Sequence, residues 1–409
     1  MDQAQGMEME REGARRSRGR LLTGVVLGTA TAIGPFSIDM YLPALPEITA
    51  EYGTSAAWTQ LTLTMFLLGM AFGQIVAGPI SDAWGRRKPL FIGLGVYIAA
   101  SLLCAVAPTI ETLAALRLLQ GLAGAAGVVI ARAIARDRFE GAELTKFFAL
   151  LTLIGGAGPI VAPMIGGQLL LFTSWHGVFV VLAAFGLWLW VSLFAAIPES
   201  LPPERRIAGG VGKSALAMFG LLRSRELIGF ALTQGMAQAG LFSYISSSSF
   251  LMQDHYGVSP QTFSWLFALC GSAFILGSQG TARLVGRFEE RKLLAAGLYV
   301  FAASGLYLLA ALAFGAGLAL VVPPLFLQVG CMGVISTTCT SLALQKHKHN
   351  AGSAAGLLGL IGMAAGALIS PLTGLGDGAT VLPIGIVIAA CNVGSLLCYV
   401  FIVRRSVHV

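Results

Sequence analysis

Residues 78–89 read Gly-Pro-Ile-Ser-Asp-Ala-Trp-Gly-Arg-Arg-Lys-Pro and connect two apolar stretches of the chain. A connection this short has to turn sharply, and Gly85 permits such a turn because it has no side chain. We expect Asp82 to cap a helix N-terminus, and Arg86 and Arg87 to anchor at lipid headgroups. The segment therefore predicts a tight, positively charged turn between two membrane-spanning helices.

Positive charge alternates between successive connections along the whole chain. When the sequence is threaded as twelve apolar spans, every Lys and Arg except Arg117 falls before the first span or after an even-numbered one. Short loops rich in Lys and Arg stay in the cytosol during insertion, so we expect both termini to be cytoplasmic. Each span has the length of about 20 residues that a hydrocarbon core of about 30 Å requires. The predicted spans are 21–43, 56–78, 89–107, 110–132, 145–170, 175–197, 226–250, 261–282, 292–312, 315–341, 351–373 and 378–403.

The composition excludes an ordinary water-soluble protein. Hydrophobic residues make up 56% of the chain and charged residues 11%, and the mean hydropathy is +0.80. The net charge of +7 is spread over the inner connections without interleaved aromatic residues, which argues against nucleic acid and favours membrane lipid as the partner. The six cysteines lie in apolar spans and predict packing residues. We expect no metal and no other cofactor, because His347 and His349 lie among Lys346, Lys348 and Asn350 in a short inner loop.

The longest polar connection divides the spans into six and six. It contains several Pro, Gly and charged residues, as a linker between two half-bundles does. We therefore expect an all-α integral membrane fold without a soluble catalytic domain. Its parts are a cytoplasmic tail (1–20), an N-terminal six-helix bundle (21–197), a cytoplasmic linker (198–225), a C-terminal six-helix bundle (226–403) and a cytoplasmic tail (404–409).

The turn described first resembles the signature loop of the major facilitator superfamily, G-x-x-x-D-x-x-G-R-R/K. The match covers Gly78, Asp82, Gly85, Arg86 and Arg87, in the corresponding place between the second and third spans. The resemblance implies the fold of that family, two six-helix bundles that alternate access to a central site. It also implies that these motif residues govern the conformational change.

Two further spans resemble motifs of the same superfamily. The fourth span, with Arg117, Gln120 and Gly121, is similar to the motif R-x-x-Q-G-x-G-A-A. The fifth span contains Gly158 and Pro159 and resembles the Gly-Pro motif associated with antiporters, with an additional Pro163. Proline inside a helix frees a carbonyl and bends the helix axis. The two prolines could simply kink the helix or could shape the contact between the half-bundles, and both interpretations describe the same bend.

Within the superfamily, the chain resembles the Bcr/CflA drug-resistance transporters. This resemblance implies proton-coupled efflux of amphipathic antibiotics, such as chloramphenicol/florfenicol-type or bicyclomycin-type compounds, by a monomer in the bacterial cytoplasmic membrane. One departure concerns the repeat of the signature loop at 279–287, which has Arg283 where the first copy has Asp82 and keeps only Gly286 and Arg287. The segments that carry the resemblance are 37–46, Arg136 with Asp137, Ser174 with Trp175, and 199–206.

Asp39 and Arg117 are the two ionisable side chains that the threading places well inside the spans. A charge there costs roughly 2.5 to 3.5 kcal/mol on insertion scales, which favours a functional use. At 1.5 Å per residue, Asp39 lies roughly 27 Å from the inner face and Arg117 roughly 10 Å below the outer face. We expect Asp39 to couple protons to substrate, close to Arg117 but not permanently paired with it. The alternatives are that Asp39 snorkels to the outer interface, and that Arg117 only binds carbonyls of the first helix.

Other polar or aromatic side chains in the spans are candidates for lining a substrate site. Each could instead simply bond a neighbouring helix, which is the commoner use. Gln234, Gln238 and Phe242 follow one another at helical spacing and form one face. The full set of candidates is Tyr41, Gln60, Gln120, Gln234, Gln238 and Phe242.

Three functional classes have different sequence requirements. The chain has no G-x-x-x-x-G-K-S/T motif, which argues against an ATP-driven pump, and no grouping in the spans suggests an intramembrane enzyme. A channel or receptor would not need a titratable Asp39 near Arg117. The sequence therefore predicts a secondary transporter that handles a small molecule and protons. A proton-coupled transporter of a small metabolite, such as a sugar or nucleobase, is the alternative to a drug exporter.

Overall fold

The computed structural model describes residues 23–139, 141–206, 224–345, 351–375 and 380–404. Within them the chain forms helices joined by short turns and has no strand beyond one isolated bridge, so the all-α prediction is confirmed there. Residues 1–20, 405–409, Lys213 of the linker, and the pair His347 and His349 lie outside the described residues.

The helices follow one another with short connections. Before the linker they are Thr23–Thr31, α2 (Ile33–Asp39), η1 (Leu42–Ala44), α3 (Leu45–Tyr52), α4 (Ala56–Trp84), α5 (Arg87–Cys104), α6 (Ile110–Arg138), α7 (Gly141–Leu169), α8 (Trp175–Ala196) and the short η2 (Pro203–Arg205). After it they are α10 (Arg225–Ser249), the π-helix η3 (Phe250–His255), α11 (Pro260–Leu284), α12 (Glu290–Ala313), α13 (Leu318–Gln345), α14 (Ala351–Ile369), η5 (Ser370–Gly374), α15 (Leu382–Cys398) and the π-helix η6 (Tyr399–Val403).

The described chain passes through a membrane many times. Nine of its helices are long and apolar enough to cross a bilayer, and a tenth span results if Thr23–Thr31 and Ile33–Tyr52 count as one helix bent by 43°. Pro35 explains this bend, because a proline has no N–H to donate to the carbonyl of Thr31, four residues earlier. The multi-pass membrane class predicted from composition is confirmed.

Several helices extend beyond the predicted apolar spans. α4 ends at Trp84 instead of residue 78, and α6 ends at Arg138 instead of residue 132. The segment 44–55, expected as a loop, contains α3. Hydropathy marks only the apolar part of a helix, whereas backbone hydrogen bonds continue through its polar ends. Asp82 and Arg136 consequently lie on helices and not in connections.

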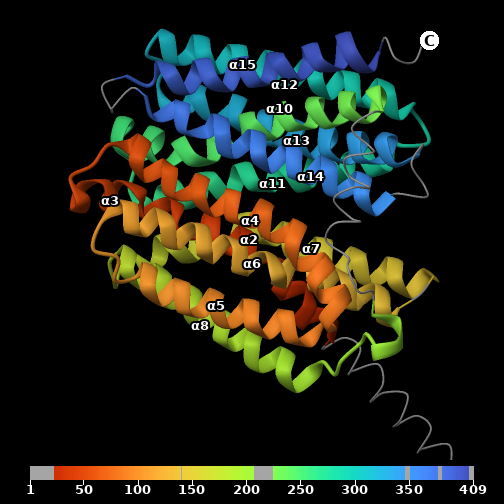
Figure 1. Cartoon of the computed structure of the whole chain (residues 1–409). Helices are drawn as coiled ribbons and strands as arrows, with labels where there is room; N and C mark the ends of the chain where they lie inside the picture. Colours follow the sequence, from red (N-terminus) through yellow and green to blue (C-terminus); the bar gives the residue numbers. More distant parts are fainter. Residues whose placement is uncertain (1–22, 140, 207–223, 346–350, 376–379, 405–409) are drawn as a thin grey trace, which may run out of the picture.

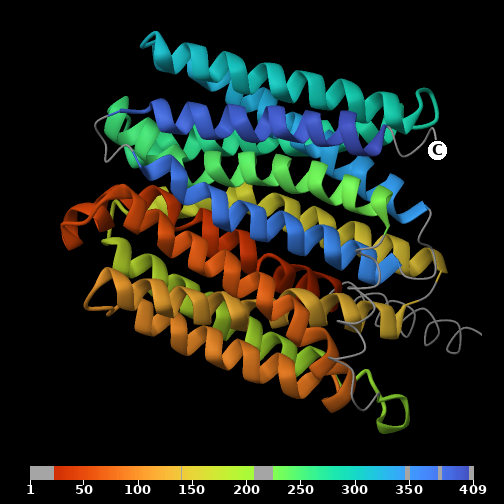
Figure 2. The ribbon, with the colours of Figure 1, turned by 45° about the horizontal axis from the view of Figure 1, so that its top comes forward.

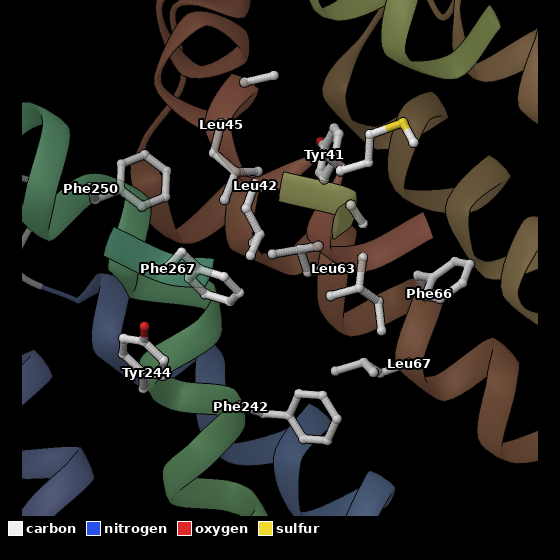
Figure 3. Packing of buried hydrophobic residues seen from close by; sticks show 14 of the residues in the cluster. Tyr41, Leu42, Leu45, Leu63, Phe66, Leu67, Phe242, Tyr244, Phe250 and Phe267 are labelled. Carbon is white, nitrogen blue, oxygen red and sulfur yellow. The ribbon is translucent and has the colours of Figure 1, made fainter. Parts of the chain in front are cut away.

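The helices pack as two neighbouring sets. In Figures 1 and 2 those from α10 onward occupy one side of the molecule, and most of those before it occupy the other. One buried apolar cluster is built only from residues between Val26 and Ile197, and another only from residues between Leu227 and Val403. A third cluster joins both sets and includes Tyr41, Phe242 and Tyr244, some of which Figure 3 shows. The space between the two sets is the natural place for a site that both can close upon.

Candidate functional site

Asp39 is the last residue of α2 and lies at a break in the first helix. Pro43 cannot donate a hydrogen bond to the Asp39 carbonyl four residues earlier, so the α-helix gives way to the short η1 helix here. The Asp39 side chain is 4% exposed and has no hydrogen bond or ion pair with any described residue. The η1 segment that follows Asp39 packs against α10 and α11 of the other set. A buried carboxylate without a partner is costly, so it calls for a proton or a ligand.

Arg117 lies in the interior of α6 and is fully buried. Its guanidinium donates to the Ser37 carbonyl at 3.0 Å and to Gln120 Oε1 at 2.6 Å, while Nε has no partner in the described chain. Three aromatic rings surround its Cζ atom, with centroids at 4.7 Å (Tyr41), 4.4 Å (Phe66) and 5.7 Å (Phe179). Cation–π contacts and the two hydrogen bonds compensate for burial of the charge.

Asp39 and Arg117 were expected to lie close together without a permanent pair. The two side chains are not paired, and Arg117 instead binds the first helix through the backbone carbonyl of Ser37. That contact is the structural alternative considered for Arg117 on sequence grounds. The closeness of Asp39 and Arg117, and the use of Asp39 in proton coupling, stay predictions.

The predicted face on α10 adjoins the boundary between the two sets. Gln234 is 8% exposed and its Oε1 has no hydrogen-bond partner among described residues. Gln238 and Phe242 lie over Gly362 and Gly366 of α14, where added side-chain carbons would meet them at 3.4 Å and 2.3 Å. Figure 3 shows Phe242 directed into the same region as side chains of α4 such as Leu67. Apolar side chains with a few unsatisfied polar groups are the usual lining of a small-molecule site.

Tyr41, Gln60 and Gln120 are buried in contacts with protein groups. The Tyr41 hydroxyl pairs with Thr62 at 3.0 Å, and Gln60 Oε1 accepts from the Thr373 hydroxyl at 3.0 Å. Gln120 accepts from Arg117 and donates to the Ser101 hydroxyl at 2.7 Å. Their exposed fractions are at most 1%, so these three side chains serve helix contacts in this conformation. Their use in lining a substrate site stays a prediction.

Arg86 is the centre of a charged network at the opposite end of α4. It is 7% exposed, and its guanidinium contacts the Asp82 carboxylate and the Ser81 hydroxyl. Its Nε donates to Asp137 Oδ2 at 2.8 Å and its Nη2 to Asp137 Oδ1 at 3.4 Å. The network joins the ends of α4 and α6 to the start of α5. Arg86 is therefore a buried ion-pair partner, and the expectation of a headgroup anchor was wrong for it.

Glu199 caps the start of α5, the role that was expected of Asp82. Its carboxylate accepts from the backbone N–H groups of Arg86 at 2.8 Å and Arg87 at 3.2 Å. Burial acts to raise the pKa of Glu199, but backbone N–H donors from Leu201, Arg86, Arg87 and Ser200 outweigh it and lower that pKa. Asp82 lies in the last turn of α4 and binds Arg86, so the predicted cap was assigned to the wrong carboxylate.

Gly85 is required by this cap. Its φ of 88° is a left-handed conformation that side chains disfavour, and a side-chain carbon there would lie 2.7 Å from Glu199 Oε2. Arg87 lies over the rings of Phe91 and Phe194 at 5.3 Å and 5.2 Å, as an interfacial cation can. Gly78 lies inside α4 and has room for a side chain, since the nearest atom, on Val129, would be 3.7 Å away.

The remaining motif residues lie on α6 and α7. Arg136 is exposed on the last turns of α6, while its neighbour Asp137 makes the ion pair with Arg86. Gly158 packs α7 on the first helix, since an added side-chain carbon would lie 2.6 Å from Pro35. Pro159 and Pro163 lie inside α7 as predicted.

Three residues of these contacts were not singled out from the sequence. Asp137 and Glu199 occur in the segments that carry the subgroup resemblance, but their partners lie 51 and 113 positions away. Tyr244 was not selected because a tyrosine within an apolar span is usually interpreted as a packing residue. No group of three or more His, Cys, Asp or Glu that could hold a metal occurs in the described part of the chain.

Comparison with known sequences finds transporters over nearly the whole chain. A family model described as Major Facilitator Superfamily matches residues 27–371. The uncharacterised MFS-type transporter YdgK of Bacillus subtilis is 42% identical over 380 residues, which cover 92% of this chain and 94% of the relative. A bicyclomycin resistance protein homolog of Haemophilus influenzae is 31% identical over 93% of this chain and 96% of its own. Multidrug resistance protein MdtL of Salmonella heidelberg is 29% identical over 91% and 93%.

Solved transporter structures share the fold. A mutant of the nucleoside transporter NupG gives a TM-score of 0.76 at 15% identity, covering 93% of this chain and 99% of NupG. A bacterial homolog of the human lysosomal transporter Spinster gives 0.72 at 16% identity, covering 96% and 97%. These identities establish the fold alone, whereas the family model and the curated relatives confirm the resemblance to Bcr/CflA-type transporters. The chain belongs to the major facilitator superfamily of membrane transporters.

Proposed function

We propose that this protein is a proton-coupled exporter that exchanges protons for an amphipathic drug by alternating access. The observation that carries the proposal is the Asp39 carboxylate, which is buried next to η1, the segment that packs against α10 and α11 of the other set, and has no partner among described residues. A carboxylate in that position can be neutralised by a proton or by a ligand that donates hydrogen bonds. Competition between these two occupants is the minimum that an antiporter requires.

Arg117 limits the chemistry of the substrate. Its guanidinium is fully buried between three rings, and both terminal nitrogens are engaged by Ser37 and Gln120, so only Nε is left for a carboxylate or phosphate of a ligand. Asp39 would repel such anions. The surrounding side chains, including Phe242 and Tyr244, suit an apolar or aromatic body. These features favour a neutral or cationic amphipathic compound.

The relatives narrow this class. One is named a bicyclomycin resistance protein homolog and several are named multidrug resistance proteins. On that basis we propose export of compounds of the bicyclomycin or chloramphenicol/florfenicol type. The bacterial relatives also support a place in the bacterial cytoplasmic membrane.

We further propose that the chain has twelve spans, in two bundles of six joined by the linker 198–225. The additional spans would be α7 and α10, whose lengths of 29 and 25 residues exceed the roughly 20 that a bilayer requires. The distribution of Lys and Arg then places both termini and the Arg86 network in the cytosol, and Asp39 nearer the outside.

Two measurements test the proposed function together. Expression in a host that lacks its own drug exporters should raise resistance to a compound of this class. In proteoliposomes, a pH gradient that is acidic on the side receiving the drug should drive accumulation of that compound, and collapse of the gradient should stop it. Resistance and transport that do not respond to the gradient would contradict proton coupling.

A further inference from the structure

Side chains from opposite sides of the linker are hydrogen bonded at the end of the bundle where α4 begins. Gln60 Oε1, on α4, accepts from the Thr373 hydroxyl of η5 at 3.0 Å, and a longer contact of 3.5 Å joins the Thr64 and Ser370 hydroxyls. All four residues are between 1% and 4% exposed. These polar groups therefore meet in a contact that contains little water. The Thr373 hydroxyl also donates to the Ser370 carbonyl of its own segment at 2.7 Å, so its single proton is shared between the two acceptors.

A second hydrogen bond between the two sets joins η3 to η1. Gln253 Nε2 donates to the Pro43 carbonyl at 3.1 Å and to the Ser249 hydroxyl at 2.6 Å. Gln253 lies in the π-helix η3, a wider helical turn that changes the direction of the side chains after α10. Pro43 lies in η1, where the first helix is interrupted four residues after Asp39. The acceptor of this bond thus belongs to the same irregular segment that positions Asp39.

The two sets are in close contact at this end. A side-chain carbon at Gly374 would lie 2.7 Å from the Cα atom of Ala57 on α4. Further along α4, Gln74 Nε2 donates to Met363 Sδ of α14 at 3.2 Å, so contact between the sets continues beyond Gln60. The bond between Gln60 and Thr373 therefore lies where the backbones of the two sets approach most tightly along α4.

The groups that close this end are neutral. The ion pairs with both partners described, such as Arg86 with Asp137 and Arg291 with Glu226, each join residues on the same side of the linker. Amide and hydroxyl groups do not titrate in the physiological range, so their bonds do not change with pH. The proton must then act on the closure indirectly, through Asp39 and the η1 segment.

We propose that the Gln60–Thr373 and Gln253–Pro43 bonds form a latch that holds the protein closed at its outer end. The strength of this latch, together with the proton on Asp39, sets the ratio of inward-facing to outward-facing molecules. This proposal rests on the alternating access of the proposed function. Loss of one latch bond is expected to raise the outward-facing fraction by roughly tenfold, because a buried acceptor that loses its donor is better satisfied by water in the open state.

The Thr373→Val variant tests the latch, since it removes the hydroxyl and keeps the branched shape. Spin labels on Ala50→Cys and His255→Cys, both exposed positions on opposite sets, report the opening as a longer distance once the native cysteines are replaced. Thr373→Ser restores the hydroxyl and should keep the distance distribution of the parent. Thr338→Val is the matched control, because its buried hydroxyl bonds only to the carbonyls of Val334 and Ile335 on its own helix.

The expected result is a roughly tenfold larger long-distance population in Thr373→Val, but not in Thr373→Ser or Thr338→Val. Gln60→Leu should shift the distances in the same direction but by less, because the Thr373 hydroxyl keeps the Ser370 carbonyl as its acceptor. The double variant should give no more than Thr373→Val, because both changes break one bond. Parent-like distances in Thr373→Val, or an equal shift in Thr338→Val, would overturn the latch. The distances require neither substrate nor a proton gradient. A shift without drug transport would therefore leave the latch intact while contradicting the proposed function.

Discussion

Replacement of Arg86 by Ala should loosen the N-terminal end of α5 by an amount that follows from its contacts. The pair with Asp137, whose side chain is 18% exposed, uses two guanidinium nitrogens and contributes about 2–3 kcal/mol, as charged hydrogen bonds do. Asp82 is 41% exposed, so its pair contributes at most about 1 kcal/mol after solvent screening. The expected loss is about 3 kcal/mol, which is roughly a hundredfold in an opening equilibrium.

Cys104 provides the assay. It is buried at the far end of α5 and is the only cysteine before the linker, so its reaction with a thiol reagent under native conditions reports detachment of this helix. In a variant that keeps only this cysteine, Arg86→Ala should raise the labelling rate by roughly a hundredfold. Arg291→Ala is the control: its side chain is 39% exposed and has one 3.5 Å contact with Glu226, so we expect a change below about fivefold. Equal effects of the two substitutions would refute this reasoning.

Two further predictions concern the cap of α5. Gly85→Ala should destabilise the protein by about 1–3 kcal/mol, because a left-handed backbone would carry a side chain pressed against Glu199; an unchanged midpoint of thermal unfolding would contradict this. Glu199→Gln should lower the unfolding midpoint at neutral pH. Because the folded pKa of Glu199 is depressed, its stabilisation is complete above about pH 4.5 and is lost as the pH falls through the lower folded value. The midpoints of parent and variant should therefore converge on acidification, and a constant difference would exclude a role for the charge.

Local sequence predicted the motif residues but not their partners. Gly85 was predicted because the short connection has to turn sharply. Asp82 and Arg86 were predicted together because both belong to the signature loop. The acceptor that caps α5 is Glu199, which follows α8 and lies 113 positions after Arg86 in the sequence. No periodicity relates residues so far apart, so the cap was assigned to the nearest carboxylate. The apolar pattern likewise placed the ends of α4 and α6 too early, because helical hydrogen bonding continues past the apolar residues.

The surroundings of the two buried charges could not be predicted from the spans alone. Counting residues along the spans predicted that Asp39 and Arg117 lie in the outer half of the membrane, but it does not give the direction in which a side chain points. Arg117 is surrounded by aromatic rings of the N-terminal set, while Asp39 lies at a proline break. Gln60 was expected to line the site, and only the packing of η5 against α4 shows its bond to Thr373.

The central claim is that Asp39 carries the coupling proton, and drug flux through Asp39→Asn under an imposed pH gradient tests it most directly. The amide keeps the size of the side chain but cannot exchange a proton, so the variant should behave as a permanently protonated carrier. We expect it to reach the membrane in normal amount, and we expect a pH gradient neither to accelerate nor to reverse its residual flux. A gradient-driven flux equal to that of the parent would contradict the account and place the proton site elsewhere.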